Sequence, residues 1–302
     1  MIYKTFVPKT FQQKGMDTIT QAEEIIQDYA NEGYTLTLRQ LYYQFVARDL
    51  IPNNDKQYKR LGKIVADARL AGLLPWDGIE DRGRNTTKWR IEESISRIVG
   101  DLEFDFNADH WAGQEYYVEV WVEKEALASV VERACRPLRV PYLPCKGYLS
   151  ASEMYEAGKR FARADRQGKM GKIIHLGDHD PSGIDMSRDN HERVQLLSGA
   201  DVDLHRVALN MPQVEEYSPP PNPTKFTDSR ATGYAELYGN TSWELDALEP
   251  SVLVSLITNE IEPLIDQHAW AEARDLEREK RTLLRRVDER WDEIEPILAR
   301  ED

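Results

Sequence analysis

Hydrophobic positions in the first seventy residues recur at the spacing of an α-helix. Between Thr18 and Asn31 the apolar side chains fall on one side of a helix, at Ile19, Ala22, Ile25, Ile26 and Tyr29. Thr37 can cap a second helix that ends before Pro52, and a third helix follows over residues 55–70. Three short helices with tight connections predict a helix-turn-helix.

The segment that follows these helices is polar. Residues 77–89 contain glycine and follow Pro75, which is compatible with a β-wing and would make the N-terminal part a winged helix. The helical periodicity breaks over residues 101–115. We therefore expect an N-terminal helical, winged-helix (CAP-like) domain over residues 1–108.

From residue 109 onward the pattern changes to strands that alternate with amphipathic helices. Apolar strand segments fall at 116–122, 140–145, 172–178 and 203–209, with helical segments at 124–135, 150–166 and 184–197 between them. This alternation predicts an α/β domain over residues 109–302 with a mostly parallel sheet. Ligands of such sheets bind beyond the carboxyl ends of the strands.

The C-terminal third carries two further features. The proline-rich segment 217–230 is expected to lack regular structure. From about Ala269 a charged amphipathic helix extends to the end of the chain, with apolar residues in register at Leu276, Leu283, Val287, Trp291, Ile294 and Leu298. We expect this helical extension to pack on its own domain or on a partner protomer.

Composition argues against a membrane-spanning protein, a secreted protein and a protein stabilised by disulfides or zinc. The 302 residues contain no run close to the roughly 18 apolar residues of a membrane span, and the N-terminal segment has no apolar core of a secretory signal. Two cysteines, Cys135 and Cys145, are too few for a disulfide framework or a zinc site. We expect a cytoplasmic protein that is not associated with a membrane.

Charge is distributed unevenly along the chain. The net charge of −14 by itself counts against binding to nucleic acid. Residues 56–90, however, hold nine basic and four acidic side chains, a local excess of about +5. Four of the basic residues form one stripe on the third helix, at Lys56, Lys59, Arg60 and Lys63, and Arg82, Arg84 and Lys88 can extend it along a wing. The stripe predicts contacts to the phosphates of double-stranded DNA, and the alternative is a solvated helix face.

Carboxylates follow two of the predicted strands. Glu123 closes the first strand, and Asp178 and Asp180 close the third. Strand ends of a parallel sheet lie side by side, and three carboxylates brought together repel one another unless a cation lies among them. Mg²⁺ prefers such oxygen ligands. The alternative is that Glu123 caps a helix and the two aspartates shape a turn.

A tyrosine in the second helix is the candidate nucleophile. Arg39 and Tyr43 are four residues apart, hence on one face of the helix, whereas Tyr42 is rotated away from that face. A guanidinium one turn away can stabilise a phenolate and hold the phosphate that it attacks. The residue pattern alone favours a simpler reading, in which both tyrosines belong to the core.

Two combinations of motifs resemble known families. Glu123 followed by the D-x-D-P-x-G sequence at Asp178 resembles the Toprim domain of topoisomerases and primases, which implies that Glu123, Asp178 and Asp180 bind metal. The R-x-x-Y-Y sequence, from Arg39 to Tyr43, before such a domain resembles the A subunit of topoisomerase VI and the related meiotic double-strand-break proteins. The short chain is similar to their stand-alone "mini-A" relatives.

This resemblance implies a chemistry. Tyr43 would be the nucleophile that forms a covalent link to a DNA 5′ end, with Arg39 beside it, and Lys146 matches the lysine of a K-G step in that family. The cofactor would be Mg²⁺, and the chain would act as a homodimer in which the partner's metal site completes each tyrosine's site. The sequence has no P-loop, so strand passage would require a separate ATPase subunit.

Two other functions remain open at this stage. A hydrolytic Toprim nuclease would use metal-bound water and leave Tyr43 as a packing residue. A protein that binds DNA or assembles with partners, without catalysis, would have no use for three intact carboxylates. The sequence favours DNA cleavage by tyrosine transesterification.

Overall fold

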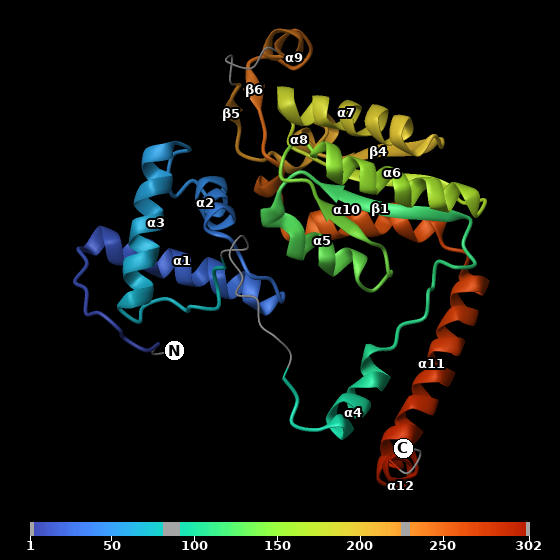
Figure 1. Ribbon diagram of the computed structural model, residues 1–302. Helices are drawn as coiled ribbons and strands as arrows, with labels where there is room; N and C mark the ends of the chain where they lie inside the picture. Colours follow the sequence, from blue (N-terminus) through green and yellow to red (C-terminus); the bar gives the residue numbers. More distant parts are fainter. Residues whose placement is uncertain (1–2, 81–90, 225–229, 300–302) are drawn as a thin grey trace.

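The computed structural model describes residues 3–80, 91–224 and 230–299. Figure 1 shows three parts: a group of helices near the N-terminus, a unit built on a sheet, and a group of helices that projects from the sheet unit. We call them the helical unit, the sheet unit and the arm. No described helix is both long enough and apolar enough to cross a lipid bilayer.

The helical unit contains α1 (Gln13–Asn31), α2 (Leu38–Ala47) and α3 (Asp55–Leu70). The three predicted helices are confirmed, although α1 begins five residues before Thr18. Thr37 caps α2: its side chain accepts from the Gln40 N–H, and the Gln40 side chain accepts from the Thr37 N–H. The apolar stripes meet in one core, in which Ile25, Leu41 and Phe45 are completely or almost completely buried.

The predicted wing is largely outside the described residues. Arg82, Arg84 and Lys88 lie there, so the structure says nothing of their place. Before this segment, Ile79 forms an isolated parallel bridge with Leu36, which ties the chain after α3 to the connection between α1 and α2.

The sheet unit is built on four parallel strands in the order β2-β1-β3-β4. They are β1 (Tyr116–Val122), β2 (Tyr142–Pro144), β3 (Met170–Leu176) and β4 (Val202–Ala208). Each connection between successive strands contains a helix: α5 (Ala128–Cys135), α6 (Ala151–Arg166) and α7 (Pro181–Ser198). The predicted parallel α/β architecture is therefore confirmed.

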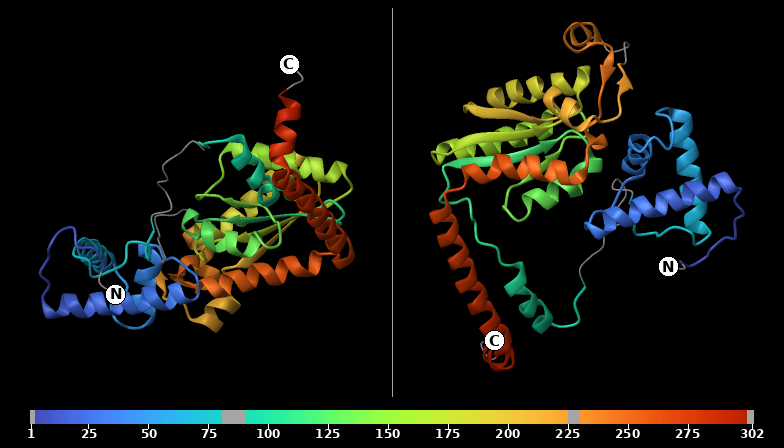
Figure 2. Two further views of the ribbon diagram at one scale, coloured as in Figure 1. Left: turned by 90° about the horizontal axis from the view of Figure 1, so that it is seen from below. Right: turned by 180° about the vertical axis from the view of Figure 1, so that it is seen from behind.

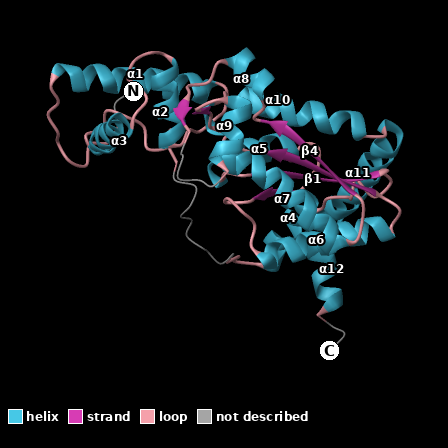
Figure 3. Ribbon diagram, turned by 90° about the horizontal axis from the view of Figure 1, so that it is seen from above, coloured by secondary structure: helices cyan, strands magenta, loops and turns pink. Residues whose placement is uncertain are grey.

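Helices cover both faces of this sheet, as Figure 3 shows from above. On one face α6 and α7 pack around Trp121 and Ile173. On the other face α5 and α10 (Pro250–Ile261) pack around Val120 and Ile174. Because β1 and β3 are central strands buried on both faces, their sequences are nearly continuous in apolar residues, as expected for parallel sheets.

Between β4 and α10 the chain forms a small extension of the sheet unit. It contains α8 (Met211–Tyr217), β5 (Asn222–Pro223), α9 (Ala231–Tyr238), β6 (Thr241–Ser242) and a 3₁₀ turn, η2 (Leu245–Ala247). The expectation that the whole segment 217–230 lacks regular structure was wrong at β5, which pairs antiparallel with β6. Proline is tolerated there because a two-stranded ribbon consists only of edge strands.

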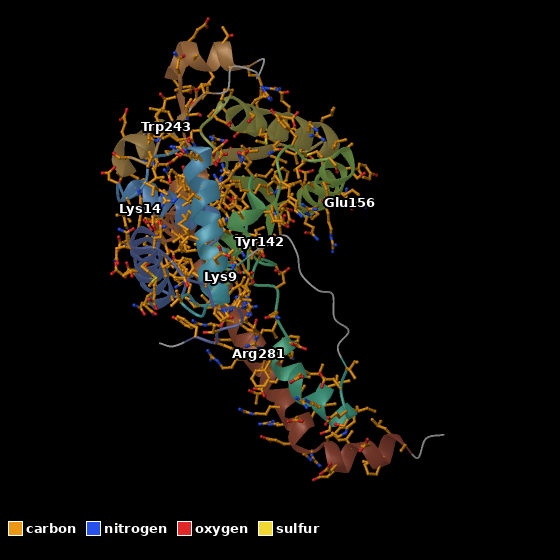
Figure 4. All side chains as sticks on the ribbon, turned by 90° about the vertical axis from the view of Figure 1, so that its left-hand side faces the viewer. Lys9, Lys14, Tyr142, Glu156, Trp243 and Arg281 are labelled. Atoms are coloured by element: carbon orange, nitrogen blue, oxygen red, sulfur yellow. The ribbon has the colours of Figure 1, made fainter. Side chains whose placement is uncertain are left out.

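The arm consists of α4 (Ile95–Asp105), α11 (Gln267–Glu289) and α12 (Trp291–Leu298). The predicted C-terminal extension is therefore two helices, with a break at Arg290. Its α11 packs against α4 and the residues that follow it. Glu277 accepts from the Ala108 N–H and contacts His110, and Arg281, labelled on α11 in Figure 4, donates to the Phe106 carbonyl.

Candidate active site

Helix α2 carries the candidate nucleophile. Tyr43 is buried, with 3% of its surface exposed, and the guanidinium carbon of Arg39 lies 5.9 Å from the centre of its ring. Its hydroxyl group is not in an apolar interior, because it accepts a hydrogen bond of 3.4 Å from the Asn222 side chain of β5. Tyr42 points elsewhere and donates to the Asn53 side chain at 2.8 Å. The two neighbouring tyrosines thus occupy different environments, as their 100° rotation predicts.

Arg39 joins the helical unit to the segment that follows β6. Its guanidinium donates to both carboxylate oxygens of Glu244, and its Nε lies 3.5 Å from Oδ2 of Asp246. Asn222 also donates to Glu244, at 3.4 Å. The side chains around the Tyr43 hydroxyl therefore form one polar network that crosses between the two units.

A cleft of about 730 Å³ opens at this junction. Tyr43 and Arg39 line it from the helical unit, and Asp180 and Glu244 line it from the sheet unit. Its other lining residues are Tyr42, Asn53, Asn54, Asp55, Tyr58, Pro181, Ser182, Asn222, Pro223, Ser242 and Trp243. One chain therefore brings the candidate nucleophile and one of the three predicted metal ligands to a common cavity.

The strand ends bring two of the predicted acids together. Val122 of β1 pairs with Leu176 of β3, so Glu123 lies beside the start of the turn that follows β3. Oε2 of Glu123 accepts from the Asp178 N–H at 2.8 Å. The sheet register thus creates the proximity that the sequence predicts for Glu123 and Asp178.

Burial and neighbouring carboxylates disfavour the ionised forms of these two acids. Burial and the Asp178 charge raise the pKa of Glu123 to about 7. Burial also raises the pKa of Asp178 to about 6, although the neighbouring Lys124 ammonium opposes this shift. Burial is the largest cause of both shifts, so a cation bound beside these acids would favour their ionised forms and lower both pKa values.

Asp180 is held differently. Its Oδ1 accepts from the Gly183 N–H at 2.7 Å and from the Ser182 hydroxyl at 3.0 Å, so that it caps α7. The alternative role of a turn-forming aspartate is thus observed for this residue. Asp180 nevertheless lines the cleft, and its charge contributes to the raised pKa of Glu123.

Lys124 occupies the centre of a second group of acids. Its ammonium lies 2.9 Å from Asp178, 2.7 Å from Glu244 and 2.7 Å from Asp246. It is itself held in the charged form, since the three carboxylates raise its pKa despite its burial. Lys124 therefore partly neutralises the acidic edge and links it to the network around Tyr43.

The donor chemistry fits Mg²⁺, although a finished coordination shell does not appear. Carboxylate oxygens are the ligands that Mg²⁺ prefers, and Glu123 and Asp178 are adjacent. Across residues 3–80, 91–224 and 230–299, no three His, Cys, Asp or Glu side chains are grouped closely enough to hold a metal ion. The Lys124 ammonium, which is paired with Asp178, lies among the carboxylates at this edge.

Lys146 follows β2 at the acidic edge and is not among the residues that line the cleft. Its backbone has a left-handed φ of 55°, and its largely exposed ammonium pairs with Glu125 at 2.7 Å. The following Gly147, with a φ of 90°, donates its N–H to the Glu123 carbonyl at 3.2 Å. The K-G step thus supports the backbone at Glu123, and the Lys146 side chain contacts neither Tyr43 nor Asp178.

Several important residues were missed by the sequence analysis. Glu244 and Asp246 form an acid-x-acid pair in the W-E-L-D segment. This spacing, which is the same as that of Asp178 and Asp180, is the sequence pattern that could have identified them. No pattern in the sequence singles out Arg206 of β4. Its buried guanidinium donates to the carbonyls of Gly177, Asp178 and Gly183, at 2.9, 2.6 and 2.9 Å, and so fixes the turn after β3.

The predicted basic stripe is present on α3. Lys56, Lys59 and Lys63 are exposed, Arg60 is half-buried, and none of the four forms an ion pair with another described residue. The first turn of α3 reaches the cleft, because Asp55 and Tyr58 line it.

A scan against known protein families finds no family that matches this chain, and a search of curated proteins finds no matching protein. We therefore infer the function from the geometry of the cleft and from the chemistry of its side chains.

Proposed function

We propose that this chain is a magnesium-dependent DNA strand transesterase that resembles the A subunit of type IIB topoisomerases. One observation carries the proposal: Tyr43 and Asp180 line the same cleft, with Arg39 and Glu244 beside them. If Tyr43 served only to pack the core, neither its hydroxyl nor the Arg39 guanidinium would be expected at a polar cleft. The exposed stripe on α3 supports duplex DNA as the substrate.

In the proposed reaction the Tyr43 hydroxyl oxygen attacks a phosphorus atom of the DNA backbone. The bond to the 3′ oxygen breaks, the phenolic proton passes to the surrounding carboxylates or water, and the departing 3′ oxygen takes a proton from solvent. Arg39 is close enough to stabilise the phenolate and the phosphate. Mg²⁺, when bound by Glu123, Asp178 and Asp180, would offset charge on the phosphate.

Cleavage of both strands requires two nucleophiles, since each chain has one Tyr43. We propose a homodimer on this ground, with a separate ATPase subunit if the cut strands are passed and resealed. The cleft is formed within one chain, so Tyr43 could react with the acids of its own chain. The resemblance instead implies that the partner's acids complete each site. Comparing adducts in mixtures of Tyr43→Phe and Glu123→Gln chains would distinguish the two arrangements.

The rival function of a hydrolytic nuclease is favoured by one specific observation. Burial and the charges of Glu244 and Asp246 raise the pKa of Tyr43 to about 12, so the phenol is protonated at neutral pH. A water molecule would then be the easier nucleophile. In a DNA-binding protein without catalysis, the Lys124 ion pairs would permanently compensate the acids.

The deciding experiment traps the covalent intermediate. Supercoiled plasmid is incubated with the protein and Mg²⁺, the reaction is stopped with denaturant, and protein attached to DNA 5′ ends is measured. Tyr43→Phe should abolish the adduct and the nicks. Tyr42→Phe is the matched control, because it removes a hydroxyl from the adjacent, equally buried ring, and it should retain both.

The alternatives give different outcomes. If Tyr43→Phe still nicks the plasmid, the hydrolytic nuclease is correct. If the wild-type protein binds duplex DNA but gives neither adduct nor nick, the assignment to a non-catalytic binding protein is correct.

A further inference from the structure

The anion that Arg39 binds in this structure is a carboxylate of the same chain. Its Nη2 donates to both carboxylate oxygens of Glu244, and its Nε lies 3.5 Å from Oδ2 of Asp246, so one edge of the guanidinium faces two acids. Arginine binds phosphate oxygens through the same donors. The side chain that the proposed reaction assigns to the phosphate is therefore already bound to an anion.

The Glu244 carboxylate also lies close to the candidate nucleophile. The side-chain amide of Asn222 is 3.4 Å from the Tyr43 hydroxyl and 3.4 Å from Oε1 of Glu244. All three side chains line the cleft together with Arg39. A phosphate that contacts Arg39 and presents its phosphorus to Tyr43 would therefore have to enter a space that Glu244 shares.

Glu244 is charged and has a second partner. Burial opposes its ionisation, but the charges of Lys124 and Arg39 lower the pKa of Glu244 to about 2. Its negative charge repels a phosphate that approaches Arg39. The Lys124 ammonium, 2.7 Å from Oε2 of Glu244, remains a partner for the carboxylate when Arg39 is released. Arg39 is the more accessible of the two cations, since its side chain is 49% exposed and that of Lys124 is 17% exposed.

The backbone on both sides of Glu244 is fixed. Trp243 exchanges two hydrogen bonds with His179, of 2.8 and 2.9 Å, and the Leu245 N–H donates to Asp178 at 2.7 Å. The following η2 turn packs against α2, and in both views of Figure 2 the chain after β6, in orange, lies where the helical unit meets the sheet unit. Release of Arg39 therefore requires rotation of the Glu244 side chain, and the segment itself can stay in place.

We infer that Glu244 is an internal competitor of the substrate: its carboxylate holds Arg39 in the free protein, and a DNA phosphate has to displace it before Tyr43 reacts. This inference rests on the proposed function, because it takes a DNA phosphate as the ligand of Arg39. The ion pair lowers the affinity for phosphate by the fraction of molecules in which Arg39 is free. Removing the carboxylate should therefore strengthen binding, and the gain should require Arg39.

The first test measures affinity for a fluorescein-labelled DNA duplex by fluorescence anisotropy, without Mg²⁺, so that cleavage is not needed. Glu244→Gln keeps the shape of the side chain and removes its charge. If Arg39 is free in about one molecule in ten, this variant should bind about tenfold more tightly. The matched control, Glu236→Gln, removes the same charge from an exposed position of α9 that does not line the cleft, and it should change the affinity by less than about twofold.

A double-mutant cycle separates competition for Arg39 from a general effect of charge. In chains that carry Arg39→Ala, Glu244→Gln should give no larger gain than Glu236→Gln, because the group for which carboxylate and phosphate compete is absent. Glu244→Asp keeps the net charge and shortens the side chain, so it should also bind the duplex more tightly than the wild-type protein. A gain that persists without Arg39, or wild-type affinity in both Glu244 variants, would overturn the inference.

Inorganic pyrophosphate gives a measurement that does not depend on DNA. Without Mg²⁺ it should raise the melting temperature of Glu244→Gln more than that of the wild-type protein, and Arg39→Ala should remove the difference. Equal shifts in all three proteins would contradict the competition.

Failure of this inference can be told from failure of the proposed chemistry. A Tyr43 adduct in the wild-type protein, with no gain of affinity in Glu244→Gln, contradicts the competition alone. A gain that requires Arg39, in a protein that forms no adduct, contradicts the transesterase alone.

Discussion

At the scale of single residues, the candidate site depends on the ionisation of Tyr43. Burial and the carboxylates of Glu244 and Asp246 disfavour the phenolate, whereas the Arg39 guanidinium favours it, and the result is a pKa of about 12. The reactive form is therefore scarce at neutral pH, and its abundance should increase about tenfold for each pH unit.

We predict a pH-dependent rate of adduct formation. Between about pH 8 and 9.5, above the pKa of Glu123, the rate should increase with pH if phenolate is the nucleophile. Glu244→Gln removes a negative charge and should move the profile to lower pH, whereas Arg39→Ala should move it to higher pH. Rapid-quench measurements of the adduct provide the profile, and a flat profile would contradict attack by phenolate.

A second residue-scale prediction concerns the acids at the sheet edge. The pKa values of Glu123 and Asp178 are raised from 4.5 and 3.8 to about 7 and about 6. Both acids are thus protonated in the folded and in the unfolded protein only below about pH 3. As the pH rises toward 7 the unfolded protein ionises first, so these two groups lower the stability of the metal-free protein.

Mg²⁺ should reverse this loss. It binds the ionised carboxylates of the folded protein, so the rise in melting temperature on adding Mg²⁺ should be larger at about pH 8 than at about pH 5. Glu123→Gln, which keeps an acceptor for the Asp178 N–H, should remove most of the difference. Differential scanning calorimetry measures the effect, and an equal shift at both pH values would argue against a metal site at Glu123.

At the scale of elements, the turn from β3 into α7 brings the backbone of Gly183 close to the backbone of Asp178. A Cβ added at Gly183 would lie 2.2 Å from the Asp178 carbonyl oxygen, too close without movement of the turn. In contrast, a Cβ added at Gly233 of α9 would have no neighbour within 4 Å. The D-x-D-P-x-G sequence therefore contains its glycine for a steric reason.

We predict that Gly183→Ala lowers the free energy of unfolding by about 1–3 kcal/mol, the usual cost of forcing extra atoms into a packed site. Gly233→Ala should be neutral or slightly stabilising, because alanine favours the helix by up to about 1 kcal/mol. Urea denaturation measures both. Equal stability of the two variants would show that the turn can move without cost.

At the scale of the whole molecule, the proposed function requires a chain of net charge −14 to attract DNA through one local surface. The sequence concentrates basic residues on α3, and the structure leaves Lys56, Lys59 and Lys63 exposed. Each lysine that contacts a phosphate releases counterions on binding, so affinity should depend steeply on salt.

Replacing Lys56, Lys59 and Lys63 by alanine should weaken binding to duplex DNA and reduce the slope of log affinity against log salt by about 3, close to 0.9 per lost contact. A charge-matched control removes the exposed basic residues Lys159, Arg163 and Arg166 of α6 and should change the slope little. Fluorescence anisotropy at several salt concentrations measures both, and equal losses would indicate a non-local charge effect.

The elements themselves could be predicted from the sequence because their signals are local. The apolar stripe of α1, the Thr37 cap of α2 and the alternation of β1 to β4 with helices each depend on neighbours within a few residues. The proximity of Glu123 to Asp178 could also be predicted, because adjacent parallel strands end at one edge. The β5 pairing could not, because Asn222–Pro223 is a two-residue strand within a proline-rich segment and has no alternation of apolar and polar residues.

The sequence by itself determined the three N-terminal helices, the parallel sheet, and which side chains are available for chemistry. Only the tertiary structure decided which opposite charges neutralise those side chains. Lys124 reaches Glu244 and Asp246 across 120 and 122 residues, and Arg39 reaches Glu244 across 205. Such contacts depend on how two units pack against the segment after β6, and no local pattern encodes that packing because its free energy comes from surfaces that meet only in the folded chain.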